Sequence, residues 1–147
     1  MTPTLADIIA GQVAALSVPP PAEAAGDYAM ARLGMVSMLA SLAAQEAERG
    51  FAARMWENGT LRALFLDATP RYDEALAGRL SRAASLDSSD LSLSALDALN
   101  AKLRSVLIAL HEAAEARGDR PLDRRILDLY IQMAHARRLE LPAALGG

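Results

Sequence analysis

The stretch from Tyr28 to Ala44 sets the strongest limit on the fold, because Arg32 is its only charged residue. The other side chains in this stretch are apolar or small on nearly every side of a helix. A helix that is hydrophobic all round is normally surrounded by protein. We therefore predict a long helix from Asp27 to Asn58-Gly59. Its first half should be central in the fold, while its second half, from Gln45 to Glu57, turns polar and should emerge into solvent.

The composition of the whole chain favours helices in the same way. Alanine occurs 32 times and leucine 24 times, whereas valine, isoleucine and threonine together occur 13 times. Alanine and leucine lose little rotamer freedom in a helix, while branched side chains suit strands. The 147 residues suit one domain. We predict an all-α fold, a compact five- to six-helix bundle with a long central apolar helix and a C-terminal antiparallel helical hairpin.

The expected organisation is a single helical domain over 1–147. It comprises an N-terminal docking helix at 1–18, a Pro/Ala linker at 19–26, a bundle core at 27–141 and a loose tail at 142–147. Within the docking helix, from about Leu5 to Leu16, one apolar stripe contains Leu5, Ile9, Val13 and Leu16, with Ile8 beside it. A lone helix of this length is marginal in water, so we expect this stripe to dock on the rest of the chain.

Several short elements are predicted between the long helix and the C-terminal hairpin. Asn58-Gly59 is typical of a helix end, and 60–67 then forms a short helix of its own. Thr69-Pro70 begins the next helix, since threonine can cap a helix and proline is tolerated in its first turn. Tyr72, Leu76, Leu80 and Ala83 mark the buried side of that helix. The Ser- and Asp-rich stretch 85–92 is typical of a loop.

Two later segments carry apolar residues at alternating intervals of three and four, the spacing of a helix–helix seam. The first contains Leu96, Leu99, Leu103, Val106 and Leu110, and the second contains Leu122, Ile126, Leu129, Met133 and Ala136. Gly118 and Asp119 form a short link between them, which predicts the antiparallel hairpin. We expect the second helix to end at Pro142.

His111 is the first candidate for metal chemistry, because Glu115 lies one helical turn later on the same face. The chain has no His-Glu-x-x-His pattern and no Glu-x-x-His pair, however. Equal distance from the hairpin link places His111 level with Asp128 and Glu115 level with Arg124. We therefore predict an ion-paired helix edge, with no metal site and no cofactor.

No other pattern predicts catalysis. The chain has no cysteine, no Gly-x-Ser-x-Gly turn and no Gly-x-x-x-x-Gly-Lys phosphate loop. Glu46 and Glu48 adjoin the apolar half of the long helix, where a buried acid is conceivable, but we favour a solvated end paired with Arg49. We assign no catalytic residue, and a non-enzymatic role is favoured over an enzymatic one.

The charge pattern indicates which partners to exclude. The net charge is −3 and the pI about 5.3, so no broad basic surface exists for nucleic acid. Arg124-Arg125 and Arg137-Arg138 place four arginines along the last predicted helix, where they could contact phosphate or an acidic partner. Because Asp123, Asp128 and Glu140 are interspersed, we favour a solvated face of mixed charge.

The N-terminus carries no positive charge before its apolar stretch, and Asp7 interrupts that stretch early. We therefore expect no secretory signal. The segment 28–44 is slightly short for a membrane span of about 20 residues, and Gly34, Ser37 and Ser41 dilute its apolar content. We expect a cytoplasmic protein that does not associate with membranes.

The segment 121–138, which reads Pro-Leu-Asp-Arg-Arg-Ile-Leu-Asp-Leu-Tyr-Ile-Gln-Met-Ala-His-Ala-Arg-Arg, resembles the opening helix of the all-helical chorismate mutases. In that family an Asp-x-x-Ile-Leu-x-Leu helix precedes a catalytic lysine and two further helices. The single lysine of this chain, Lys102, lies upstream of the segment, and no further helices are predicted after it. We interpret the segment as an amphipathic helix and do not assign the chain to the family.

The long helix also suggests a function. Four of the six methionines, Met30, Met35, Met38 and Met55, lie in or near it, and methionine suits both partner grooves and cores. Its apolar half needs more covering surface than short neighbouring helices provide, and the pairing of two copies would supply that surface. We hypothesise a non-catalytic, self-associating helical module or adaptor that forms a homodimer and binds another protein.

The candidate interface or pocket residues are Tyr28, Met35, Met38, Leu39, Leu42 and Trp56. In the alternative hypothesis, the same side chains line a pocket between helices that holds an apolar or acyl ligand. The chain would then be a small-molecule binding protein or an enzyme.

Overall fold

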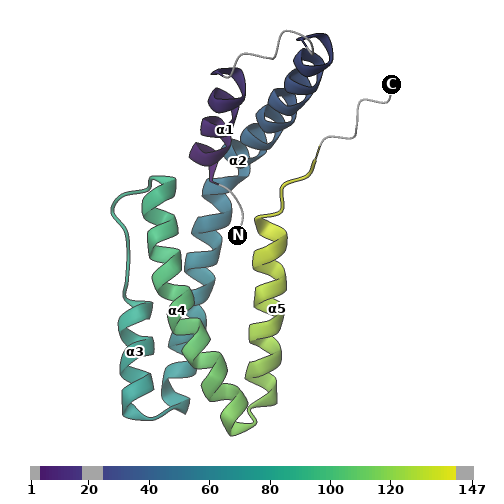
Figure 1. Cartoon of the computed structure of the whole chain (residues 1–147). Helices are drawn as coiled ribbons and strands as arrows, with labels where there is room; N and C mark the ends of the chain where they lie inside the picture. Colours follow the sequence, from purple (N-terminus) through teal and green to yellow (C-terminus); the bar gives the residue numbers. More distant parts are fainter. Residues whose placement is uncertain (1–3, 18–24, 142–147) are drawn as a thin grey trace. The chain divides into compact units, whose positions relative to one another are not determined.

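The computed structural model describes residues 4–17 and 25–141, and the residues described are all-helical, without a strand. Its elements are α1 (Leu5–Ser17), α2 (Ala25–Ala68), the 3₁₀ turn η2 (Thr69–Arg71), α3 (Glu74–Ala84), α4 (Leu93–Arg117) and α5 (Arg120–Ala136) (Figure 1). The all-α helical bundle with one long helix and a C-terminal hairpin is therefore confirmed. Contacts divide the described residues into two compact units, with boundaries after Gly50 and after Ala136.

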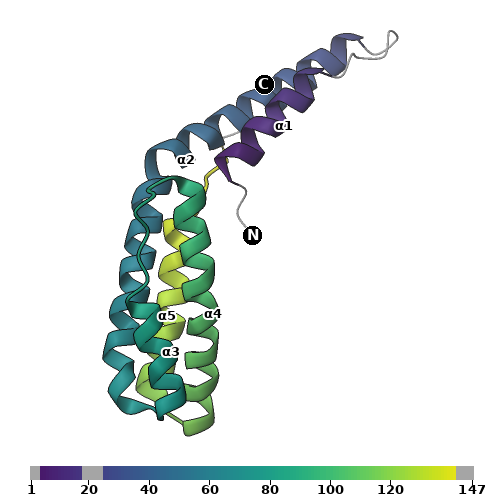
Figure 2. The ribbon, with the colours of Figure 1, turned by 90° about the vertical axis from the view of Figure 1, so that its left-hand side faces the viewer.

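The second unit, Phe51–Ala136, is a four-helix bundle made by the last part of α2 with α3, α4 and α5, which lie side by side in Figure 2. Its core contains Leu61, Leu64, Phe65, Ala68, Leu80, Ala83, Leu99, Leu103, Leu107, Leu110, Ala114, Leu122, Ile126, Leu129 and Met133. The three-and-four spacing predicted both seams of the α4–α5 hairpin. Val106 is partly buried, and the neighbouring Leu107 is fully buried in its stead.

The predicted helix end at Asn58-Gly59 is wrong, because α2 continues through it to Ala68. Asn58 is 2% exposed, and its side-chain amide donates to the Leu96 carbonyl at 3.1 Å. A buried bond to another helix thus occupies the amide that would otherwise favour a local turn. The short helix predicted over 60–67 is accordingly the final part of α2.

The predicted helix start at Thr69-Pro70 is also wrong. Proline lacks an N–H to continue α2, and Thr69 Oγ1 donates to the Phe65 carbonyl at 2.7 Å, so this stretch forms the turn η2. Helix α3 begins after Asp73, whose carboxylate caps it by accepting from the Leu76 backbone N–H at 2.9 Å. The loop predicted over 85–92 is present between α3 and α4.

The α4–α5 link follows the predicted chemistry at Gly118. This glycine caps the C-terminal end of α4, and its φ of 67° is in the left-handed region that glycine adopts without strain. Asp119 then caps α5 by accepting from the Leu122 backbone N–H at 3.2 Å. Helix α5 ends at Ala136 rather than at Pro142, and 137–141 is not helical.

The first unit comprises α1, α2 up to Gly50 and the residues from Arg137. The helices α1 and α2 run antiparallel here, side by side in both ribbon views (Figures 1 and 2). Gln12 Nε2 donates to the Val36 carbonyl at 3.3 Å, and Arg32 Nε donates to the Ala15 carbonyl. The bond to the Ala15 carbonyl places the Arg32 cation near the C-terminal end of α1, where the helix dipole favours it.

Helix α1 packs by a face that is shifted by one position along the sequence from the predicted stripe. Ile8 is the buried residue of α1, and Gln12 and Ala15 follow it at helical intervals of four and three. Thr4 and Asp7 cap the helix reciprocally, and the hydrogen bonds from the Thr4 hydroxyl and backbone lower the pKa of Asp7. The predicted docking of the stripe is therefore wrong for its larger part, which stays exposed.

The linker predicted at Pro19–Pro21 and the loose tail predicted at 142–147 lie outside the described residues. The single-domain organisation stays a prediction. None of the helices described here has an apolar stretch sufficient to cross a membrane.

One glycine substitution tests the continuity of α2, and a second tests the turn between α4 and α5. Gly59 lies inside α2, and a β-carbon added there would meet nothing within 4 Å, so Gly59→Ala should raise the free energy of unfolding by about 0.5–1 kcal/mol. Gly118→Ala should lower it by about 1 kcal/mol, because alanine is strained at positive φ. Urea denaturation of both variants measures these effects. Destabilisation by Gly59→Ala would mean that α2 ends at Asn58-Gly59 after all.

Candidate functional site

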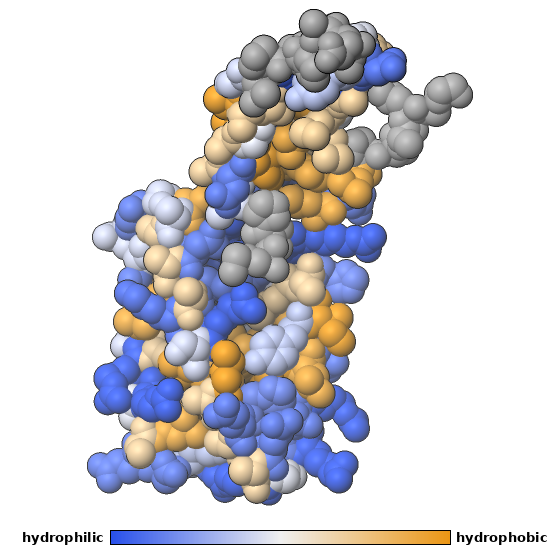
Figure 3. Space-filling view, viewed as in Figure 1, coloured by the Kyte–Doolittle hydropathy of each residue, from blue (hydrophilic) through white to orange (hydrophobic). Residues whose placement is uncertain are grey.

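On α1 and α2 the first unit exposes six large non-aromatic apolar side chains, which we call the apolar hairpin surface. They are Ile9, Val13 and Leu16, which follow one side of α1, and Met30, Leu33 and Met35, which are spread around the sides of α2 that α1 leaves exposed. Each is between 46% and 70% exposed, and hydrophobic side chains are prominent over this part of the molecule in Figure 3. The expectation that protein surrounds the first half of α2 is therefore wrong, because none of residues 28–44 is buried. Among the described residues of the unit, helix α1 packs against this half and covers one side of it.

The predicted interface residues are divided between the two units. Tyr28 and Met35 are exposed, while Met38, Leu39 and Leu42 are half-buried, and all five lie on the part of α2 that belongs to the first unit. Trp56, 39% exposed, belongs to the second unit.

Sequence reasoning missed five members of the apolar hairpin surface, namely Ile9, Val13, Leu16, Met30 and Leu33. The signal was present in α1, whose stripe was recognised but was taken to dock within the chain. On α2, apolar residues surround the helix, so the pattern cannot say which side α1 covers. The contacts of Gln12 and Arg32 decide that side.

Charge is sparse on the two helices that carry this surface. In 5–17 and 25–44 the charged residues are Asp7, Asp27 and Arg32. Asp7 is engaged in the cap of α1, and Arg32 bonds α1 and lies over the Tyr28 ring, 5.9 Å from its centre. Depletion of charge is the compositional mark of interface centres.

The polar part of α2 in the first unit holds the segment that follows α5. Gln45 Nε2 donates to the Glu140 carbonyl at 2.8 Å, and Gln45 Oε1 accepts from the Glu140 backbone N–H at 2.9 Å. Arg49 donates to Gln45 Oε1 at 2.9 Å and to the Arg138 carbonyl at 3.3 Å. The solvated end predicted for this region is wrong at Glu46, which is 5% exposed.

A buried polar network joins α2 to α4 in the second unit. Asn100 donates to Glu57 Oε2 at 3.0 Å and to Asn58 Oδ1 at 2.9 Å. Next to it, Arg54 and Asp97 form an ion pair with two contacts of 2.9 Å each. Glu57 is fully buried and Asn100 is 3% exposed, so the half of α2 that was expected to emerge into solvent is buried at these positions.

This network positions two helices and was missed by sequence reasoning. Buried polar groups have to find partners, and a network in which they do so selects one alignment of the helices that carry it. The signal was the spacing of Arg54, Glu57 and Asn58 on one helix and of Asp97 and Asn100 on another, each one turn apart. Asparagine before glycine was instead interpreted as a helix end.

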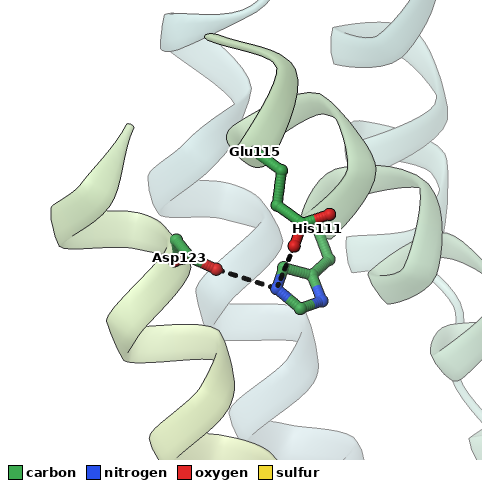
Figure 4. Close-up of side chains that lie close together, drawn as sticks. All are labelled: His111, Glu115 and Asp123. Carbon is green, nitrogen blue, oxygen red and sulfur yellow. Dashed lines mark hydrogen bonds and ion pairs between the residues drawn. The ribbon is translucent and has the colours of Figure 1, made fainter. Parts of the chain in front are cut away.

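A third cluster lies beside the hairpin link, between the last turns of α4 and the first turn of α5 (Figure 4). His111 Nε2 lies 2.9 Å from Asp123 Oδ1 and 4.0 Å from Glu115 Oε1. The His111 ring also packs on the Tyr130 ring, with centres 5.7 Å apart, and burial raises the pKa of Tyr130. A histidine and two carboxylates are a set of groups that can share a proton or hold a metal ion.

The predicted partner of His111, Asp128, is wrong. Equal distance from the hairpin link gives a residue's height along the helix but not the direction in which its side chain points. Asp128 lies five residues from Asp123, which is about 140° around the helix. Asp123 and Tyr130 are seven residues apart on the side of α5 that faces His111. Glu115 contacts His111 rather than the predicted Arg124.

The predicted row of four arginines is also divided. Arg124 and Arg125 lie on α5, but Arg137 and Arg138 follow its end. Arg125 pairs with Asp67 at 2.8 Å, and this hydrogen bond lowers the pKa of the Asp67 carboxyl.

No family model, curated protein or solved structure matches this chain. The resemblance of 121–138 to chorismate mutases is therefore not extended beyond one amphipathic helix, which the structure forms as α5.

Asn100→Leu tests the buried network. It removes the donor that Glu57 Oε2 and Asn58 Oδ1 share, so the free energy of unfolding should fall by about 2–4 kcal/mol in urea denaturation. Asp67→Asn, which alters an exposed ion pair, is the control and should leave stability unchanged within error. Equal stability of the two variants would contradict the role of the network.

Proposed function

We propose that this chain is a non-catalytic, self-associating helical module whose two copies pair through the apolar hairpin surface. The observation that carries the proposal is the exposure of Ile9, Val13, Leu16, Met30, Leu33 and Met35 on one antiparallel pair of helices. Full burial of a large apolar side chain contributes roughly 1.5–3 kcal/mol, and scattered single exposures need no such explanation. Six on one helix pair favour a partner.

The chemistry of the surface supports a second copy as that partner. A two-fold interface brings the same patch of both copies together, so a charge near the two-fold axis faces the same charge of the other copy. The helices α1 and α2 carry three charges there, of which Asp7 and Arg32 are already engaged within the chain and Asp27 lies in the first turn of α2. Pairing of two helical hairpins would create a four-helix arrangement in which Asp27 is the one charge that has to stay apart from its copy.

We further propose that the dimer acts in the cytoplasm as an adaptor for another protein. The second unit supports the adaptor role, because its four-helix core and buried polar network hold its helices in one arrangement and none of its residues belongs to the apolar hairpin surface. Exposed apolar side chains on α5 of that unit, Leu127 and Ile131, suit contacts with a different protein.

Analytical ultracentrifugation of the full chain tests self-association. The wild-type protein should sediment as a dimer at tens of micromolar. Leu33→Asp should weaken dimerisation at least tenfold, because it places a charge on each copy within the interface. Leu33 is 63% exposed, so the substitution should leave the fold of each chain intact, as circular dichroism checks.

Ile131→Asp is the matched control, since Ile131 is 57% exposed on α5 and lies outside the apolar hairpin surface. It should leave the dimer unchanged. A folded wild-type monomer at high micromolar concentration would contradict self-association. Equal weakening by Leu33→Asp and Ile131→Asp would contradict the assignment of the surface.

A further inference from the structure

We propose that His111, Glu115 and Asp123 bind a divalent transition-metal ion that bridges α4 and α5. The three residues each offer one ligand atom, and these atoms all lie within 4.8 Å of one another (Figure 4). The helix spacing of His111 and Glu115 supplies two of them, and the hairpin brings Asp123 opposite. This site is independent of the apolar hairpin surface.

The distances between ligand atoms suit an ion of this kind. Atoms about 2.1 Å from a tetrahedral ion lie about 3.4 Å from each other. His111 Nε2 lies 2.9 Å from Asp123 Oδ1 and 4.0 Å from Glu115 Oε1, so the observed distances lie on both sides of that value. The ligand atoms of Asp123 and Glu115 lie within 4.8 Å of each other, so side-chain movements of about 1–1.5 Å would bring the three atoms to metal-binding positions.

The chemistry of the three groups indicates the class of ion. An imidazole nitrogen with two carboxylates suits zinc and other late first-row ions better than magnesium or calcium, which take oxygen ligands. Three protein ligands leave a fourth position of a tetrahedral ion for water. An ion bound by His111 Nε2 would replace the contact between that nitrogen and Asp123 Oδ1.

The site is open to solvent, and contacts within the chain restrain the His111 imidazole. The His111 side chain is 18% exposed, that of Asp123 33% and that of Glu115 65%, so an ion can reach the group from solvent. Contact with the Tyr130 ring and the bond to Asp123 limit the freedom of the His111 ring. Glu115, the most exposed of the three, is the ligand with the freedom to close on the ion.

Calorimetric titration of the full-length protein with Zn²⁺ at neutral pH tests the site. The wild-type chain should bind one equivalent, and His111→Gln and Asp123→Asn should each weaken binding by about tenfold or more. The chain has two histidines and no cysteine, so His135→Gln, on the exposed side of α5, is the matched control and should bind as the wild type does. Equal affinities of the His111 and His135 variants would overturn the proposal.

Imidazole nitrogen NMR spectra of the wild-type protein give a result that does not depend on any variant folding. Zn²⁺ should shift the Nε2 signal of His111 and leave the signals of His135 unchanged. A shift confined to His135, or no shift of either histidine at millimolar Zn²⁺, would show that the cluster serves as an ion pair alone and would overturn the metal site.

Discussion

The continuity of α2 past Asn58-Gly59 is the constraint on which the rest of the structure depends. The helix contributes Leu61, Leu64 and Phe65 to the core of the second unit, and it can do so because the chain does not turn before them. Asn58 and Asn100 make that possible by hydrogen bonding inside the bundle. Polar groups thus decide how far an otherwise apolar helix extends.

The same helix reverses the ordinary relation between hydrophobicity and burial. Its polar positions Arg54, Glu57 and Asn58 are buried, and each has a hydrogen-bond partner on α4. Its apolar positions Met30 and Leu33 are exposed, because α1 is a single narrow helix that packs on another side. Burial follows the number of neighbouring elements available to cover a face, and in the described part of the first unit α1 is the one helix beside α2. A second copy would supply the missing cover.

Sequence reasoning succeeded where one physical signal acted alone. The seams of α4 and α5 followed from leucine spacing, and the link followed from the need for glycine at the positive φ of Gly118. It failed where tertiary contacts competed with a local preference. Asn58 favours a turn by local preference, but its contact with Leu96 keeps it in the core. His111 pairs with Asp123 because their side chains point toward each other, which equal distance from the link could not predict.

The candidate surface was predicted in part for a similar reason. Periodicity identified the stripe of Ile9, Val13 and Leu16 but could not show that α1 packs by Ile8 instead. The composition of α2 identified Met35 as a candidate, yet an all-round apolar helix has no pattern from which its free side can be read.

The central claim is that two copies meet at the apolar hairpin surface, and contacts between methionine methyl groups and the second copy test it most directly. Chains labelled at the methionine methyl groups are mixed with unlabelled chains, and nuclear Overhauser effects between the two kinds are recorded. Contacts should appear at Met30 and Met35, whereas Met55, 40% exposed in the second unit, should show none. Intermolecular contacts at Met55 alone, or at no methionine, would contradict the claim.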